Sequence, residues 1–208
     1  MTKELLAQGR LQHFHSTNIS QRENDFNEAQ AQKEGWSKDT FRVSRWSFDD
    51  LAGVPDDDKY DLMVCNDSFL HSTDRDGMIK EFSRILSTGG VAFFSDILQN
   101  PNSPDEDLKA IRARFSESTL GTAEEYQELF KKHKFEEIDV SFRTENLQRH
   151  YGLVRYSATG PKREQMLHPE TGVTQEFFDK TVAGLDQWLV ASAGGHIKHG
   201  WFTYRNTL

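Results

Sequence analysis

The stretch YDLMVCNDSFLHSTDRDGMIKEFSRILSTGGVAFFSDIL, residues 60–98, predicts the fold of this chain. Its first part, Tyr60–Cys65, is a short apolar run, which is typical of a strand buried on both faces of a parallel sheet. From Asp74 onward, apolar residues recur at helical spacing, which predicts a helix. We expect this helix to end at Gly89, because glycine accepts the backbone conformation of a helix end. Val91–Phe94 then reads as a second strand. The stretch therefore predicts one strand–helix–strand unit of an α/β sheet.

Polar side chains follow both strands of this unit. Asp67 and His71 lie in the loop after the first strand, and Asp96 follows the second. Ligands of open parallel sheets bind beyond the carboxyl ends of the strands, so we expect these three side chains to face one crevice. A histidine there would move a proton near neutral pH, and the carboxylates would hold a polar or cationic group. Helix capping and packing are the alternative roles.

Composition limits the class of protein. A chain of 208 residues suits one domain, and its formal net charge of −8 argues against a nucleic-acid-binding surface. Cys65 is the single cysteine, which excludes an internal disulfide and fits the cytoplasm. Because Cys65 ends a predicted buried strand, we expect its thiol to be inert. No run approaches the roughly 20 apolar residues of a membrane span. We expect a small-molecule substrate and neither nucleic acid nor membrane as a partner.

The remainder of the chain predicts further helices and strands. Helices are expected at Thr2–Gly9, Asn18–Glu34, Asp105–Ser116, Thr144–Ser157, Thr174–Val190 and after a capping box at Thr122–Glu125. Strands are expected at Leu11–Thr17, Thr40–Ser44, Phe135–Phe142 and Gly200–Arg205. His13 and His15 share one face of the first of these strands and make it too polar for a central position. No metal-binding spacing accompanies them, so we expect exposed histidines and no metal site.

Several of these motifs resemble class I SAM-dependent methyltransferases. The features in question are the acidic residue at the strand end, Phe69-Leu70-His71, and Glu81-x-x-Arg84-Ile85-Leu86-x-x-Gly89-Gly90. They are similar to the branch that contains sarcosine/dimethylglycine and phosphoethanolamine N-methyltransferases, and FLHS at 69–72 suggests the former type. The resemblance covers about Leu5 to Arg205. It implies an α/β, Rossmann-like methyltransferase sheet in a single domain, 1–208, with a helical substrate cap over residues 101–190.

The resemblance also implies a set of site residues. Cofactor contacts are expected at Asn18, Ser47 and Asp67. Arg149-His150-Tyr151 resembles an HHY-type segment of the substrate pocket, and the further candidates for substrate binding are Lys198, His199 and Trp201. The candidates for acid–base catalysis are His71, Asp96 and His150. The ordinary alternative is helix packing for Tyr151 and solvent exposure for His150.

One part of the family pattern has no counterpart here. A SAM methyltransferase begins with a strand, a Gly-rich loop and a helix, whereas Gly9 is the only glycine before Gly35. We therefore expect an N-terminally reduced sheet without its central first strand. The neighbouring strands would then face a gap of roughly 9–10 Å lined by unpaired backbone. Direct closure of the sheet, a strand lent by a partner, or an incomplete chain would each account for it.

Three functions follow from this incomplete pattern. The leading hypothesis is a small-molecule enzyme that performs SAM-independent isomerisation, cyclisation or elimination, with acid–base assistance in an aromatic cap pocket. The first alternative is SAM-dependent N-methylation of a small amine, with the missing loop supplied by a partner or by omitted sequence. The second is a non-catalytic subunit. A homo-oligomer or a homologous partner would complete the sheet. SAM is the candidate cofactor, and the incomplete site leaves open whether SAM binds.

Overall fold

The computed structural model describes residues 2–56, 58–113 and 119–208. The chain divides into two compact units, Met1–Pro55 and Asp56–Leu208. Each unit contains a sheet of its own, with two strands in the first and four in the second. Direct closure of the second strand of the family pattern onto the fourth was one of three ways to account for the missing strand. In the described residues the corresponding strands belong to different sheets, so this closure is not observed.

The N-terminal unit consists of α1 (Thr2–Ala7), β1 (Phe14–Thr17), α2 (Gln21–Lys33) and β2 (Phe41–Ser44). The two strands are parallel, with Phe14 opposite Phe41 and their ring centroids 5.2 Å apart. Trp36, just after α2, also stacks on Phe41 at 5.2 Å. Aromatic stacking therefore holds the end of α2 to this small sheet. His15 is half-buried against Trp46 rather than solvent-facing, contrary to the prediction.

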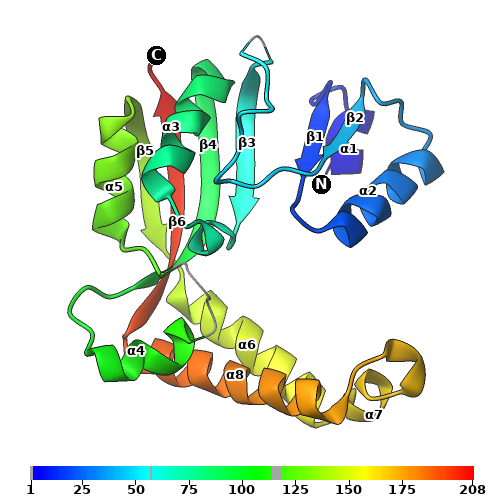
Figure 1. Ribbon diagram of the computed structural model, residues 1–208, viewed down its shortest axis with the longest axis vertical. Coiled ribbons are helices and arrows are strands. Elements are labelled where there is room, and N and C mark those ends of the chain that lie inside the picture. The colour runs from blue at the N-terminus through cyan, green and yellow to red at the C-terminus, as the bar shows by residue number, and fades with distance from the viewer. Residues whose placement is uncertain (1, 57, 114–118) are drawn as a thin grey trace. The chain divides into compact units, whose positions relative to one another are not determined.

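The C-terminal unit is built on the strands β3 (Tyr60–Asn66), β4 (Leu86–Gln99), β5 (Phe135–Phe142) and β6 (Ile197–Asn206). The order in the sheet is β3-β4-β6-β5, with β3 parallel to β4 and β6 antiparallel to both of its neighbours (Figure 1). Its helices are η1 (Phe69–His71), α3 (Arg75–Ile85), α4 (Asp105–Arg112), α5 (Ala123–Lys132), α6 (Thr144–Thr159), α7 (Arg163–Met166), η2 (Pro169–Thr171) and α8 (Gln175–Ala193). The predicted strand–helix–strand unit is β3–α3–β4.

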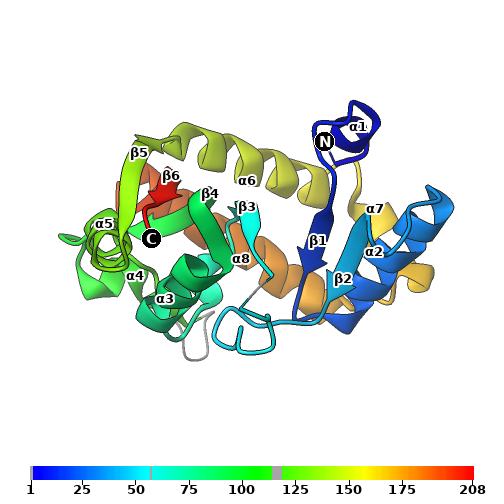
Figure 2. The same ribbon diagram turned by 90° about the horizontal axis from the view of Figure 1, so that it is seen from above.

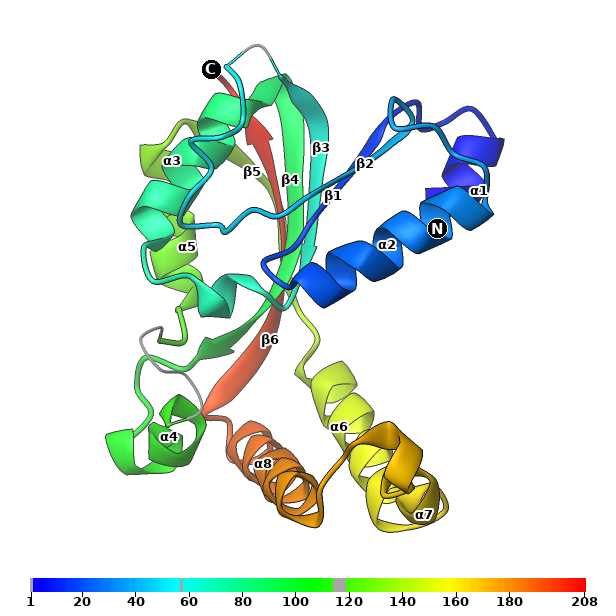
Figure 3. The same cartoon turned by 45° about the vertical axis from the view of Figure 1, so that its right-hand side comes forward.

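An aromatic core lies between the sheet and the layer formed by α3 and α5 (Figure 3). Its centre is Phe94 of β4, which is fully buried. The ring of Phe94 lies 4.6 Å from that of Phe69, 4.8 Å from that of Phe202 and 5.3 Å from that of Phe130. Because side chains alternate along a strand, this packing fixes the direction of every neighbour of Phe94 on β4. The packing of Phe94 therefore decides which polar residues face which side.

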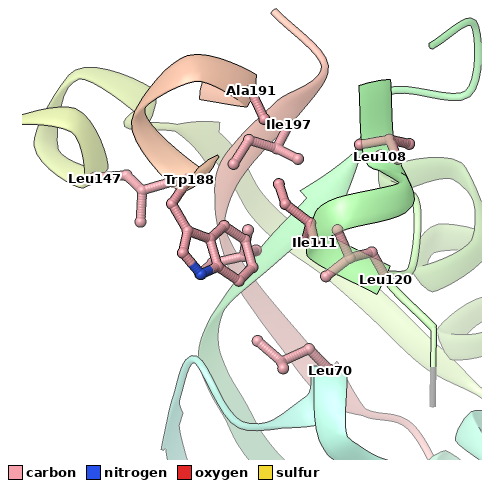
Figure 4. Packing of buried hydrophobic residues seen from close by; sticks show 9 residues of the cluster. Leu70, Leu108, Ile111, Leu120, Leu147, Trp188, Ala191 and Ile197 are labelled. Carbon is pink, nitrogen blue, oxygen red and sulfur yellow. The ribbon is translucent and has the colours of Figure 1, made fainter. Parts of the chain in front are cut away.

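A second cluster of buried apolar residues lies where the β4–β6 ribbon meets the helices. Figure 4 shows its members, which come from η1, β4, α4, the segment after α4, α6, α8 and β6: Leu70, Ile97, Leu108, Ile111, Leu120, Leu147, Trp188, Ala191 and Ile197. The helices α6 and α8 run side by side (Figure 2). Of the expected cap over 101–190, α5 and β5 belong to the sheet layers, whereas α4 and α6–α8 form the helical part. None of the helices in the described ranges is long and apolar enough to cross a membrane.

The structure corrects two details of the central stretch. Leu62 is 54% exposed and Val64 is 43% exposed, so the face of β3 that carries them is not buried. Gly89 does not end α3, since the helix stops at Ile85 and β4 starts at once. Gly90 lies within β4, where a Cβ would come within 3.0 Å of the Tyr60 carbonyl oxygen. Close backbone approach therefore explains that glycine.

Most other elements agree with the sequence. Phe135–Phe142 is a strand with the predicted bounds, and the predicted helix Asp105–Ser116 is observed to Arg112, while Ser116 lies outside the described residues. The short α7 was not predicted, because the Gly160-Pro161 breaker before it favours a loop.

The capping box of α5 provides a test of local stability. The Thr122 hydroxyl accepts a hydrogen bond from Glu125 N at 3.0 Å, and the Glu125 carboxylate accepts one from Thr122 N at 3.3 Å. We expect Thr122→Ala to lower the free energy of unfolding by about 1 kcal/mol in urea denaturation. Thr159→Ala, at the exposed end of α6, is the matched control and should change it by less than about 0.5 kcal/mol. Equal effects of the two substitutions would contradict the capping role.

Candidate active site

Three strands converge on the carboxylate of Asp67. Asp67 follows β3 directly and has φ 48°, a left-handed conformation that is uncommon for residues other than glycine. Its N–H donates to the Ser95 carbonyl oxygen of β4 at 2.9 Å. Its Oδ1 accepts hydrogen bonds from Ser95 Oγ at 2.7 Å and from His199 Nε2 of β6 at 2.8 Å. Contacts to two further strands thus hold this side chain in place.

These contacts keep Asp67 ionised. Burial alone would raise the pKa of its carboxyl group. The hydrogen bonds from His199 and Ser95, together with the charges of His199 and His150, outweigh burial and lower the pKa below its ordinary value. The side chain is 40% exposed. The result is a fixed negative charge at the end of β3 that solvent and small molecules reach.

His199 and Trp201 present unpartnered polar atoms on the same face of the sheet. His199 is 8% exposed, and because a carboxylate only accepts hydrogen bonds, its Nε2 carries the proton toward Asp67. When the ring is neutral, its lone pair is therefore on Nδ1. Nδ1 of His199 and the indole Nε1 of Trp201 are both buried without a hydrogen-bond partner, and their rings lie 5.7 Å apart. Such orphaned groups beside an ionised carboxylate indicate a candidate binding site.

Asp96 lies on the opposite face of the sheet, against α5. It is fully buried and accepts hydrogen bonds from the Tyr126 hydroxyl at 2.6 Å and from Leu70 N at 3.3 Å. Burial raises the pKa of Asp96 to about 7, although these hydrogen bonds and the charge of Arg75 oppose the rise. Arg75 also pairs with Glu125. Asp96 therefore belongs to an internal network that joins β4, α3 and α5.

The expectation that Asp67, His71 and Asp96 face one crevice is wrong. Ser95 and Asp96 are neighbours on β4, so their side chains point to opposite faces, and it is Ser95 that lies beside Asp67. His71 ends η1 with an exposed side chain. Its role as a proton carrier stays a prediction.

The two candidates on α6, His150 and Tyr151, agree with the alternative of solvent exposure for His150 and helix packing for Tyr151. His150 is exposed, and its charge acts on Asp67, which places it on the side of the candidate site. Tyr151 is half-buried, packs against the cluster of Figure 4 and lies 5.8 Å from the Trp188 ring. Tyr151 thus supports α6 on α8, while its ring also lies 5.5 Å from that of His150.

The remaining predicted contacts are Lys198 in the C-terminal unit and Asn18 and Ser47 in the N-terminal unit. Lys198 alternates with His199 along β6 and places its ammonium 5.5 Å from the Phe142 ring centre. Asn18 and Ser47 belong to the N-terminal unit, where their side-chain oxygens accept hydrogen bonds from Ser20 N and Asp49 N. These local turn contacts leave the predicted cofactor roles of Asn18 and Ser47 as predictions.

Sequence reasoning did not single out two side chains that hydrogen-bond to the predicted residues Asp67 and Asp96. The first is Ser95, because the alternation of side chains along β4 puts it on the opposite face from Asp96. The second is Tyr126, because helical periodicity assigns it to the apolar face of its helix. Burial raises the pKa of the Cys65 thiol to about 12, in keeping with the expected inert thiol.

Comparisons with known proteins agree with this fold. A family model described as a methyltransferase domain matches residues 1–94. The chain is 34% identical over 188 residues to sarcosine/dimethylglycine N-methyltransferase of Halorhodospira halochloris, covering 90% of this chain and 65% of that protein. It is 31% identical over 184 residues to the enzyme of that name from Aphanothece halophytica, covering 88% and 64%. The chain thus spans slightly less than two thirds of the length of these relatives.

A solved structure shows the same fold. The crystal structure of a Galdieria sulphuraria protein, described as a sarcosine dimethylglycine methyltransferase, superposes with a TM-score of 0.84 at 22% identity and covers 94% of this chain and 69% of that one. The predicted α/β, Rossmann-like fold is confirmed. The relatives favour methyl transfer over the SAM-independent chemistry that the incomplete glycine pattern suggested. The chain resembles the class I SAM-dependent methyltransferases and, among them, the sarcosine/dimethylglycine N-methyltransferases.

Proposed function

We propose that this protein takes part in the SAM-dependent N-methylation of a small amino acid such as sarcosine or dimethylglycine. The observation that carries the proposal is the 34% identity to the Halorhodospira halochloris enzyme across 90% of the chain. The single thiol fits a reducing compartment, and we propose the cytoplasm as the place of action.

The electrostatics of the candidate site suit this reaction. SAM, when bound, supplies a methyl group activated by a positively charged sulfonium, and the amine substrate is also cationic in its resting form. The ionised carboxylate of Asp67 attracts a cation of either kind. Because Ser95 and His199 hold this carboxylate in a single position, it also orients what it attracts. Asp67 therefore fits the predicted cofactor contact.

The Asp67–His199 pair also provides a group that can accept the proton of the substrate amine. A protonated amine has no lone pair, so it must lose a proton before its nitrogen attacks a methyl carbon. Asp67 keeps the proton of His199 on Nε2, which leaves Nδ1 to receive the proton from the amine. The buried surroundings of His199 limit competition from water.

Binding and transfer measurements test the proposed function. Purified protein is titrated with SAM and S-adenosylhomocysteine in a calorimeter, and transfer from methyl-labelled SAM to sarcosine, dimethylglycine and phosphoethanolamine is assayed. We expect micromolar cofactor binding and label on the two amino acids, with phosphoethanolamine as the unlabelled control. Binding without transfer to any amine would instead support the non-catalytic subunit. A folded protein that neither binds nor transfers would contradict the proposal.

A further inference from the structure

The backbone of His199 is held at the junction where β5 ends and α6 begins (Figure 1). The last residue of β5, Phe142, lies opposite Gly200 of β6. The next two residues to meet are Arg143 and His199, and Arg143 N donates to the His199 carbonyl oxygen at 2.8 Å. In a regular antiparallel ladder such a pair exchanges two hydrogen bonds, so the N–H of His199 would donate to the Arg143 carbonyl oxygen.

The first turn of α6 occupies the acceptor of that second hydrogen bond. The Arg143 carbonyl oxygen accepts from Asn146 N at 2.9 Å. The N–H of His199 donates instead to the side chain of Thr144, the first residue of α6, whose Oγ1 lies 3.3 Å away. The hydroxyl of Thr144 thus takes the place of a backbone carbonyl in the ladder.

The position of the His199 ring depends on this acceptor. His199 is buried, and a buried N–H group without a partner costs about as much free energy as a lost hydrogen bond. The same residue places its Nε2 2.8 Å from Asp67 Oδ1, so a displaced backbone would also displace the ring from Asp67. We propose that Thr144 is a positioning residue for the Asp67–His199 pair. Its effect on the reaction rests on the proposed methyl transfer, whereas the position of His199 is measurable without turnover.

Two further observations connect α6 with this pair. The helix packs against β6, the strand that carries His199. The charge of His150, farther along the same helix, acts on Asp67. α6 therefore influences both members of the pair, Asp67 through the charge of His150 and His199 through the hydroxyl of Thr144. Because Thr144 itself is only half-buried, its hydroxyl can be removed without disturbing the aromatic core.

A matched pair of substitutions tests this role. Thr144→Val keeps the shape of the side chain and removes its oxygen, whereas Thr144→Ser keeps the oxygen. In Thr144→Val we expect the backbone amide of His199 to exchange with deuterium at least about tenfold faster, and the Nε2–H resonance of His199 to shift in ¹H–¹⁵N spectra. We expect kcat to fall at least about tenfold, with KM for SAM and for the amine within about threefold of the unmodified protein. Thr144→Ser should keep all of these values within about threefold of the unmodified protein.

A third variant separates lost position from lost stability. Thr122→Ala removes the capping hydrogen bond of α5, on the opposite face of the sheet, so it should destabilise the fold while kcat and both His199 signals stay unchanged. Three results overturn the proposal: unchanged His199 signals in Thr144→Val, a kcat in that variant within about threefold of the unmodified protein, or an equal fall in Thr144→Ser. If the unmodified protein transfers no methyl group, the proposed function fails, and the His199 signals alone decide whether Thr144 positions this residue.

Discussion

Asp67→Asn is expected to lower kcat/KM for methyl transfer at least about 100-fold while the protein stays folded. The substitution removes the negative charge that Ser95 and His199 hold at the end of β3. It also replaces an obligate acceptor with a group that donates as well, so the proton of His199 is no longer confined to Nε2. Both consequences act on the reaction rather than on the core, because the side chain is 40% exposed.

Steady-state kinetics, cofactor titration and long-range ¹H–¹⁵N NMR of the histidines measure these effects. The spectra should show a bare Nδ1 on His199 in the unmodified protein and a changed tautomer in Asp67→Asn. Ser95→Ala removes one of the two donors and should cost about tenfold in kcat/KM. Asp139→Asn, an exposed carboxylate of β5, is the matched control. If Asp67→Asn keeps its kcat/KM within about threefold, the charge of Asp67 has no part in the reaction.

Asp96→Asn is expected to flatten the dependence of stability on pH. Burial raises the pKa of Asp96 from 3.8 to about 7 in the folded protein. The folded state therefore holds the proton more tightly than the unfolded state between these values, so this stabilisation is complete below 3.8 and is lost as pH rises through 7. The loss amounts to at most about 4 kcal/mol. Asparagine resembles the protonated carboxyl and does not ionise, so the variant escapes this loss.

Urea denaturation at intervals from about pH 5 to pH 8 measures the difference between the two proteins. Tyr126→Phe removes the hydrogen bond that favours the ionised form, so it should shift the unfolding profile toward higher pH. Asp76→Asn is the matched control, because Lys132 and His133 lower the pKa of Asp76 below its ordinary value of 3.8, so its contribution to stability does not change between about pH 5 and pH 8. Parallel profiles for Asp96→Asn and the unmodified protein would show that Asp96 titrates normally in the fold.

Local pattern was sufficient for most of the secondary structure. The period of the apolar residues predicted α3, and the capping box predicted the start of α5, since both depend on residues within one or two turns. The bounds of Phe135–Phe142 were predicted correctly for the same reason. The fold class followed from the strand–helix–strand order and from the resemblance to methyltransferases, and the relatives and the solved structures confirm both.

The site depended on contacts between distant segments. The sequence marked Asp67, Asp96 and His199 as polar residues of interest, but it contained no signal that Asp67 would meet His199, 132 residues away, rather than Asp96. The packing of Phe94 against α5 turned Asp96 inward and left Ser95 beside Asp67. Side-chain types and local periods are properties of the chain itself. Which polar groups share a face is decided only when the strands pair and one side of the sheet is buried.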